Sequence, residues 1–78
     1  MKKITYIVES RETKTNDFIS DSGYARFKDA KEYFNRLIDD KKCYKGETIL
    51  LVKQTCLYDR KGEFVEILEE EIKKEIEL

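Results

Sequence analysis

The chain of 78 residues has no histidine, proline or tryptophan, and it has only three glycines and two cysteines. Without an imidazole it cannot build a Ser-His-Asp triad, a Cys-His pair or the common zinc sites. Gly23, Gly46 and Gly62 stand apart from one another, so there is no glycine-rich loop to cradle a phosphate. We therefore expect no catalytic residue, no metal site and no cofactor.

The carboxylates offer little to an enzyme either. The acidic runs Asp39-Asp40 and Glu69 to Glu71 would have to face each other across a cleft to act as a glycosidase pair. A domain this small rarely builds such a cleft, because it buries only about 60% of its unfolded surface. We interpret these groups as solvated surface carboxylates, and we expect a protein that is not an enzyme.

The cysteines and the lengths of the apolar runs indicate in which cellular compartment the protein is expected. Cys43 and Cys56 are not spaced as Cys-x-x-Cys, and two cysteines are too few for a small fold held by disulfides. No apolar run approaches the ~18 residues that span a bilayer, and the N-terminal residues lack a signal-peptide core. The sequence predicts one cytoplasmic domain over residues 1–78 with no membrane partner.

Charge is abundant but unevenly placed. Residues 63–78 hold seven acids and two lysines, a net charge of −5, whereas residues 1–62 hold fourteen bases and ten acids, a net charge of +4. The two parts add to the net charge of −1 for the chain. Such a separation of charge between two parts of a chain often marks an interaction surface.

Periodicity predicts two strands and one helix. Residues Lys3 to Ser10 and Thr48 to Tyr58 are rich in β-branched and aromatic side chains, which is typical of strands. Between them, apolar residues recur at the three- and four-residue spacing of a helix that faces a core. That stripe consists of Phe27, Ala30, Tyr33, Phe34, Leu37 and Ile38.

Two boundaries stay open in the sequence. Residues 11–23 form either a loop or a hairpin in which Thr15 to Ser20 lies beside the first strand. The helix starts either at a capping box of Asp29 with Glu32 or earlier, with Ser22 as its cap. The fold class is α+β in both cases: a mainly antiparallel sheet of three or four strands, with one amphipathic helix packed on one face.

A hairpin closes the predicted sheet. Asp59 to Gly62 suits a type I turn with Gly62 as a left-handed bulge residue. In that register Tyr58 faces Phe64, Leu57 faces Val65, Thr55 faces Ile67 and Lys53 faces Glu69. Residues 70–78 then form either a short helix or a frayed acidic tail; as a continued strand they would place Ile72 opposite Leu50.

Both faces of this hairpin are apolar, and this leads to the main functional hypothesis. One helix covers only one face of a sheet, so the tail, a second copy of the chain or another protein must cover the other face. We expect a non-enzymatic protein-binding module, with a protein partner or a homodimer formed through that face and the acidic segment. The predicted contact residues are Leu50, Val52, Tyr58, Phe64, Leu68, Glu69, Glu70 and Glu71.

Two alternatives remain. Aromatic and basic residues alternate near both ends of the helix, as in proteins that stack single-stranded bases and bind phosphates. A nucleic-acid-binding domain would use Arg26, Lys28, Lys41, Lys42, Tyr44 and Lys45. The other alternative is a homodimeric structural or assembly subunit without a further partner.

The helix "FKDAKEYFNRLI" and the turn "YDRKGEF", after a strand and a polar loop, resemble small accessory proteins of phages and prophages. That group includes inhibitors of host enzymes and of antiviral defence complexes, anti-CRISPR proteins among them. The resemblance implies a single non-catalytic domain that acts by binding inside the bacterial host cell.

Overall fold

The computed structural model describes residues 1–41 and 45–78. Its elements are β1 (Lys2–Glu12), β2 (Phe18–Tyr24), α1 (Phe27–Lys41), β3 (Glu47–Tyr58) and β4 (Phe64–Glu77). The four strands form one antiparallel sheet in the order β2-β1-β3-β4, so β2 and β4 are the edge strands. The expected α+β class is confirmed, and the sheet has four strands rather than three.

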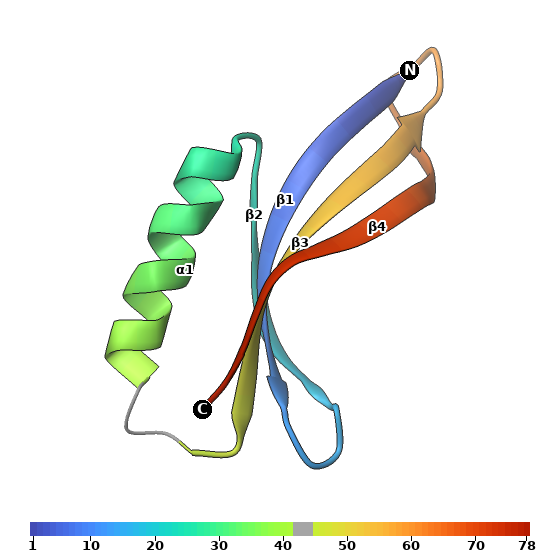
Figure 1. The fold of residues 1–78 in the computed structure, drawn as a ribbon. Coiled ribbons are helices and arrows are strands. Elements are labelled where there is room, and N and C mark those ends of the chain that lie inside the picture. The colour runs from blue at the N-terminus through green and yellow to red at the C-terminus, as the bar shows by residue number, and fades with distance from the viewer. Residues whose placement is uncertain (42–44) are drawn as a thin grey trace.

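Helix α1 lies along one face of the sheet (Figure 1). Its inward stripe buries Ala30 and Phe34 against Val8 of β1 and against Ile49 and Leu51 of β3. Each of these five residues is at most 4% exposed. The helical spacing in the sequence identified this stripe correctly, and the small core beneath α1 follows from it.

The helix begins at neither of the two expected caps. Ser22 belongs to β2, and α1 starts at Phe27, two residues before Asp29. The Phe27 ring contacts Tyr6 of β1 edge to face, with ring centroids 5.5 Å apart. The Ala30 amide donates to the Arg26 carbonyl at 3.2 Å in this first turn. Sequence spacing alone does not reveal the contact with Tyr6.

The first hairpin answers the question about residues 11–23. A strand is present, but β2 begins at Phe18 rather than Thr15. The turn before it has Asn16 at φ 62°, and the Asn16 amide donates to the Glu12 carbonyl at 2.7 Å. Asparagine tolerates this left-handed conformation better than most residues, so the turn extends to Asp17 before pairing resumes.

The second hairpin turns as expected. The Gly62 amide donates to the Asp59 carbonyl at 3.1 Å, and the Asp59 amide donates to the Glu63 carbonyl at 2.9 Å. Gly62 has φ 83°, which a residue with a side chain adopts only at a cost. The Asp59 carboxylate also accepts hydrogen bonds from the Lys61 and Glu63 amides, which holds the turn closed.

Beyond the turn, the expected register is wrong in all but its first pair. Tyr58 does pair with Phe64, but Leu57 pairs with Glu66, Cys56 with Ile67, Thr55 with Glu69 and Lys53 with Glu71. The pairing shifts three times, at bulges between Leu51 and Val52, Thr55 and Cys56, and Leu57 and Tyr58. Each bulge inserts an extra residue in β4, so simple alternation misplaces the side chains of this strand.

The acidic tail is a strand. β4 continues for 14 residues to Glu77, so the expected helix or frayed end at residues 70–78 is wrong. Ile72 pairs with Val52 rather than with Leu50. Pairing with the long strand β3 outweighs the weak helical preference of the Glu and Lys pairs, which contribute only about 0.2–0.5 kcal/mol each.

The sheet has two unequal parts. β2 ends at Tyr24, opposite Tyr6, and α1 begins at Phe27 at the same level. The sheet continues past that level as three strands, carrying the N-terminus and the β3–β4 turn beyond the helix (Figure 1). We call residues 1–5 and 54–70 the arm, and the remaining described residues the body.

Candidate functional site

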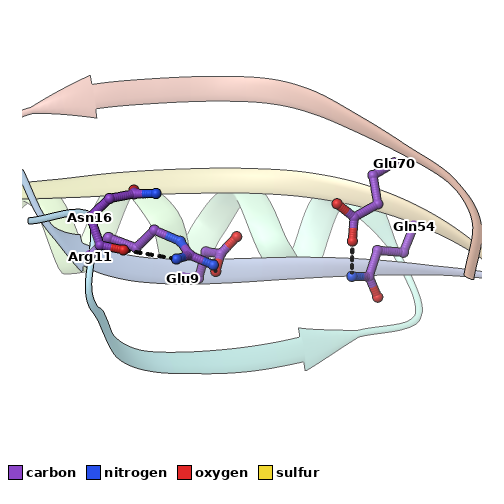
Figure 2. Close-up of polar contacts among 5 residues, drawn as sticks. All are labelled: Glu9, Arg11, Asn16, Gln54 and Glu70. Carbon is purple, nitrogen blue, oxygen red and sulfur yellow. Dashed lines mark hydrogen bonds and ion pairs between the residues drawn. The ribbon is translucent and has the colours of Figure 1, made fainter.

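The candidate site lies on the face of the sheet that points away from α1, which we call the open face. Ile49 and Leu51 point into the core under the helix, so the alternate residues of β3 point the other way. Directly paired residues share a face, which places their partners in β1 and β4 there too. Figure 2 looks onto this face, with α1 behind the sheet.

In the body, polar groups and neighbouring side chains close the open face. Leu50 lies between Glu9 and Glu75, and Val52 lies between Ile7 and Ile72. Leu50 is 8% exposed and Val52 is 5% exposed, although no helix or strand of the described residues covers them.

A polar network closes the body's open face further along β1. Arg11 forms an ion pair with Glu9 at 3.2 Å and donates to the Asn16 carbonyl at 3.0 Å (Figure 2). Both side chains are mostly buried, Glu9 at 17% exposed and Arg11 at 31%. This part of the open face is therefore largely polar, and its exposed apolar side chains, Phe18 beside Arg11 and Ile72 beside Val52, stand apart at its two ends.

In the arm, the open face is apolar and accessible. Met1 pairs with Tyr58 through two backbone hydrogen bonds, at 2.8 Å and 2.7 Å, which puts its side chain beside that ring. Phe64 and Ile67 of β4 point to the same side, with exposed fractions of 56% and 44%. We call this surface the open-face patch; its members are Met1, Cys56, Tyr58, Phe64 and Ile67.

Aromatic contacts organise the patch. The Phe64 and Tyr58 rings meet edge to face with centroids 6.0 Å apart. The ammonium group of Lys3 lies 5.0 Å from the centre of the Tyr58 ring, a cation–π contact. Cys56 sits in the middle strand and is buried, a free thiol. The patch is thus a preformed apolar surface with one cation at its β1 side.

A carboxylate stands at the opposite side of the patch. Glu70 of β4 accepts a hydrogen bond of 2.8 Å from the Gln54 side-chain amide on the open face (Figure 2). Past this pair, Ile72 adds a further exposed apolar side chain. The patch is therefore bordered by a lysine on β1 and a glutamate on β4, with β3 between them.

The other face of the arm is different. There Ile4 of β1 and Leu57 of β3 are accompanied by charged side chains. Lys2 on β1 and Glu66 and Glu69 on β4 belong to the arm, and Lys53 and Glu71 follow at the edge of the body. Charges in these positions keep that face solvated without a covering layer, so the open-face patch is the apolar side of the arm.

Glu71 has a perturbed carboxyl group. Lys73 donates a hydrogen bond to it at 2.9 Å, and this bond together with the charge of Lys73 lowers the pKa of Glu71 below its ordinary value. Lys53 on the neighbouring strand adds to the effect, and slight desolvation opposes it. The side chain is exposed, so the shift reflects a surface ion pair rather than a catalytic group.

The structure brings together only some of the predicted contact residues. Tyr58 and Phe64 are in contact, but Leu50 and Val52 are buried by their neighbours. Leu68 is 42% exposed at a bulge of β4. Of the three acids, Glu70 lies on the open face, whereas Glu69 and Glu71 pair with Thr55 and Lys53, whose side chains point to the helix side.

Sequence reasoning missed Ile67 and Met1. Simple alternation placed Ile67 on the helix side together with Leu57, whereas its pairing with Cys56 puts it on the open face. The bulge that moves it has no clear sequence signal, since neither glycine nor proline marks the position. The place of Met1 in the patch follows only from its backbone pairing with Tyr58 in the structure.

The alternative nucleic-acid set does not form one surface where it is described. Arg26 and Lys28 lie at the start of α1, whereas Lys41 ends the helix and Lys45 follows it. A 15-residue helix separates the two groups by about 20 Å. Lys42 and Tyr44 lie outside the described residues. The Arg26 guanidinium is 3.9 Å from the Asp29 carboxylate, which partly neutralises the first group.

No group of three or more potential ligand side chains that could hold a metal occurs within residues 1–41 and 45–78. In the same residues, no helix is long and apolar enough to cross a membrane. The chain matches no protein-family model, no curated protein and no solved structure. The resemblance to phage accessory proteins therefore stays a prediction.

Proposed function

We propose that this chain is a non-enzymatic protein-binding module and that the open-face patch is its binding surface. The supporting observation is the accessible apolar area of the arm, where Phe64 and Ile67 stand beside Tyr58 on a face that no described element covers. Contiguous exposed apolar area of this kind usually marks an interface in a folded protein. A sheet face with this composition is ordinarily buried under a second layer.

The edges of the arm are poorer candidates than its face. β4 is an edge strand with three bulges, and residues 63–71 hold five glutamates and no cation. Bulges and like charges are common devices that prevent a free edge from pairing with another strand. A partner therefore gains more from covering the open face than from extending the sheet.

Charge around the patch restricts the partner. A protein that covers the patch lies next to Glu70 on one side and next to Lys3 on the other, whereas Glu69 and Glu71 point to the helix side. Such a partner carries cations near β4, which steers association and fixes orientation. On the resemblance to phage accessory proteins, we further propose that the module inhibits a host enzyme or defence complex.

Site-specific photo-crosslinking in the cells that encode the chain tests the patch. A photoreactive phenylalanine analogue at Phe64 should give a discrete protein adduct, because this ring lies in the proposed contact. The matched control is the analogue at Phe18, which is exposed to 54% against 56% for Phe64 but lies in the body at the far end of β2. An adduct at 64 and none at 18 is expected. No adduct at 64, or equal adducts at both positions, contradicts the proposal.

A further inference from the structure

The charges that border the open-face patch indicate what covers it. Lys3 lies on β1 at one side, Glu70 lies on β4 at the other side, and the apolar residues stand between them. We propose that the patch binds a second copy of this chain, with two arms packed face to face about a two-fold axis parallel to the strands. This inference depends on the proposed function, because it concerns the same surface; it makes a second copy of the chain, and not a host protein, the occupant of the patch.

The arrangement of the strands selects that axis. Rotation about an axis along β3 exchanges the outer strands, so β1 of one copy lies over β4 of the other. Lys3 of each copy then lies over β4 of its partner, two residues along the strand from Glu70, and its long side chain can turn from Tyr58 to reach that carboxylate. The contact occurs twice, as in an isologous dimer. An axis across the strands would instead stack β1 on β1 and β4 on β4, so that Lys3 would not lie over the strand that carries Glu70.

The apolar part of the patch suits the same packing. β3 lies at the axis, where the small side chain of Cys56 leaves room between the two sheets. The Phe64 and Tyr58 rings of both copies can then interdigitate across the ~10 Å spacing that is usual for stacked sheets. A β-sandwich formed in this way supplies the second layer that the arm lacks.

The same axis also brings the open faces of the two bodies toward each other, so the two sheets must diverge past the arm to keep the charged groups of the body in water. The body is the part that resists stacking. Its open face is occupied by the Glu9–Arg11 ion pair and by the carboxylates of Asp21 and Glu75, which a second sheet would desolvate. Three strands about 4.8 Å apart and about six residues long at ~3.3 Å each give a footprint of roughly 300 Å² per copy. This is small for a stable dimer, so we expect a dissociation constant on the order of micromolar or weaker.

Exchanging the charges of Lys3 and Glu70 in the full chain tests whether these residues meet across the proposed dimer interface. Sedimentation velocity from about 1 µM to about 1 mM should show a monomer–dimer equilibrium. Lys3→Glu and Glu70→Lys should each weaken the dimer about tenfold, and the double variant should restore most of the affinity. Within one copy these residues lie on outer strands about 10 Å apart, with β3 between them, so restoration reports a contact between copies.

The matched controls use the same two strands, one residue away. Lys2→Glu and Glu69→Lys carry identical charge changes on the helix-side face of the arm. They should change the dissociation constant less than about threefold, because their charges lie outside the interface. Far-ultraviolet circular dichroism of each variant verifies that the fold is retained.

Three results would overturn the inference. The first is a monomer at every concentration. The second is that the control variants weaken the dimer as much as Lys3→Glu and Glu70→Lys do, and the third is that Lys3→Glu and Glu70→Lys leave its dissociation constant unchanged. The crosslinking experiment separates this failure from failure of the proposed function. If the chain is monomeric and its Phe64 analogue captures a different protein, the homodimer is contradicted but the proposed function stands. If the Phe64 analogue gives no adduct, both the homodimer and the proposed function are contradicted.

Discussion

The body and the arm share the three strands β1, β3 and β4, yet the side chains on these strands are buried to different extents in the two regions. In the body, Val8, Ile49 and Leu51 are at most 1% exposed beneath α1. In the arm, Phe64 and Ile67 are 56% and 44% exposed, although their backbones are paired in the same sheet. Strand pairing therefore does not ensure side-chain burial in this protein. β1, β3 and β4 are paired in both the arm and the body, whereas α1 buries side chains in the body alone.

Tyr6 marks the boundary between the two regions. It pairs with the last residue of β2, Tyr24, and its ring contacts the first residue of α1, Phe27. The fourth strand and the covering helix thus stop at the same level. Beyond it, none of the residues in 1–41 and 45–78 pairs with the free side of β1 or covers either face of the arm, and this is why its apolar side chains are exposed.

The largest expected difference between the regions concerns stability. Leu51→Ala, in the body, should lower the free energy of unfolding by about 2–5 kcal/mol, because it removes a fully buried side chain and leaves a cavity. Ile67→Ala, in the arm, should lower it by less than about 1 kcal/mol in the monomer. Urea unfolding at low protein concentration measures both, and Ile49→Val serves as a milder body variant if Leu51→Ala does not fold. Equal losses would remove the distinction between the regions.

A turn variant tests whether the arm unfolds together with the body. Gly62→Ala should lower the free energy of global unfolding by about 1–2 kcal/mol, because φ 83° is unfavourable for alanine. The control is Gly23→Ala in β2, where an added Cβ meets only the Thr5 methyl at an ordinary 3.7 Å. A loss confined to local exchange of arm amides, with unchanged global unfolding, would show instead that the arm opens independently.

Two aromatic pairs provide a finer comparison. A double-mutant cycle of Tyr58→Leu and Phe64→Leu should give a coupling of about 0.5–1.5 kcal/mol in the arm. The same cycle on Tyr6 and Phe27, an edge-to-face pair at 5.5 Å, should give a similar coupling in the body. Chemical unfolding of the four variants of each cycle measures it. A coupling absent from the arm alone would mean that Phe64 is mobile in the free monomer.

The smallest expected effect depends on pH. The folded pKa of Glu71 is lowered by Lys73, so this contribution to stability is present above the unfolded pKa and is lost as the pH falls through the folded pKa. Lys73→Met should therefore destabilise the chain slightly at about pH 7 and negligibly at about pH 3. Urea midpoints at both values measure the difference. A difference that grows on acidification would contradict the assignment to this ion pair.

Sequence patterns predict the local structure of this chain correctly but do not predict the contacts between residues far apart in the sequence. The helical stripe with Ala30 and Phe34 and the turn at Gly62 are encoded by neighbours in the chain, and both were predicted. The strand formed by the acidic tail depends on pairing with β3, and the Tyr6–Phe27 contact joins residues far apart in the chain, so neither could be predicted from local sequence.

The candidate site was half predicted for the same reason. An uncovered apolar face that includes Tyr58 and Phe64 follows from alternation along the hairpin. The inclusion of Ile67 and the burial of Leu50 and Val52 depend on bulges and on neighbouring strands. No pattern of residue types in β4 predicts the positions of its β-bulges.

The pairing of Met1 with Tyr58 has a practical consequence for handling the protein. The N-terminal amine lies at the tip of the arm, hydrogen-bonded to the Tyr58 carbonyl and next to the open-face patch. The other end of the chain lies at the far end of the body, where the Leu78 carbonyl accepts a hydrogen bond from Gly46 (Figure 1). A purification tag or fluorescent fusion before Met1 would thus sit beside the proposed interface and compete with whatever binds there, whereas the same fusion after Leu78 would leave it open.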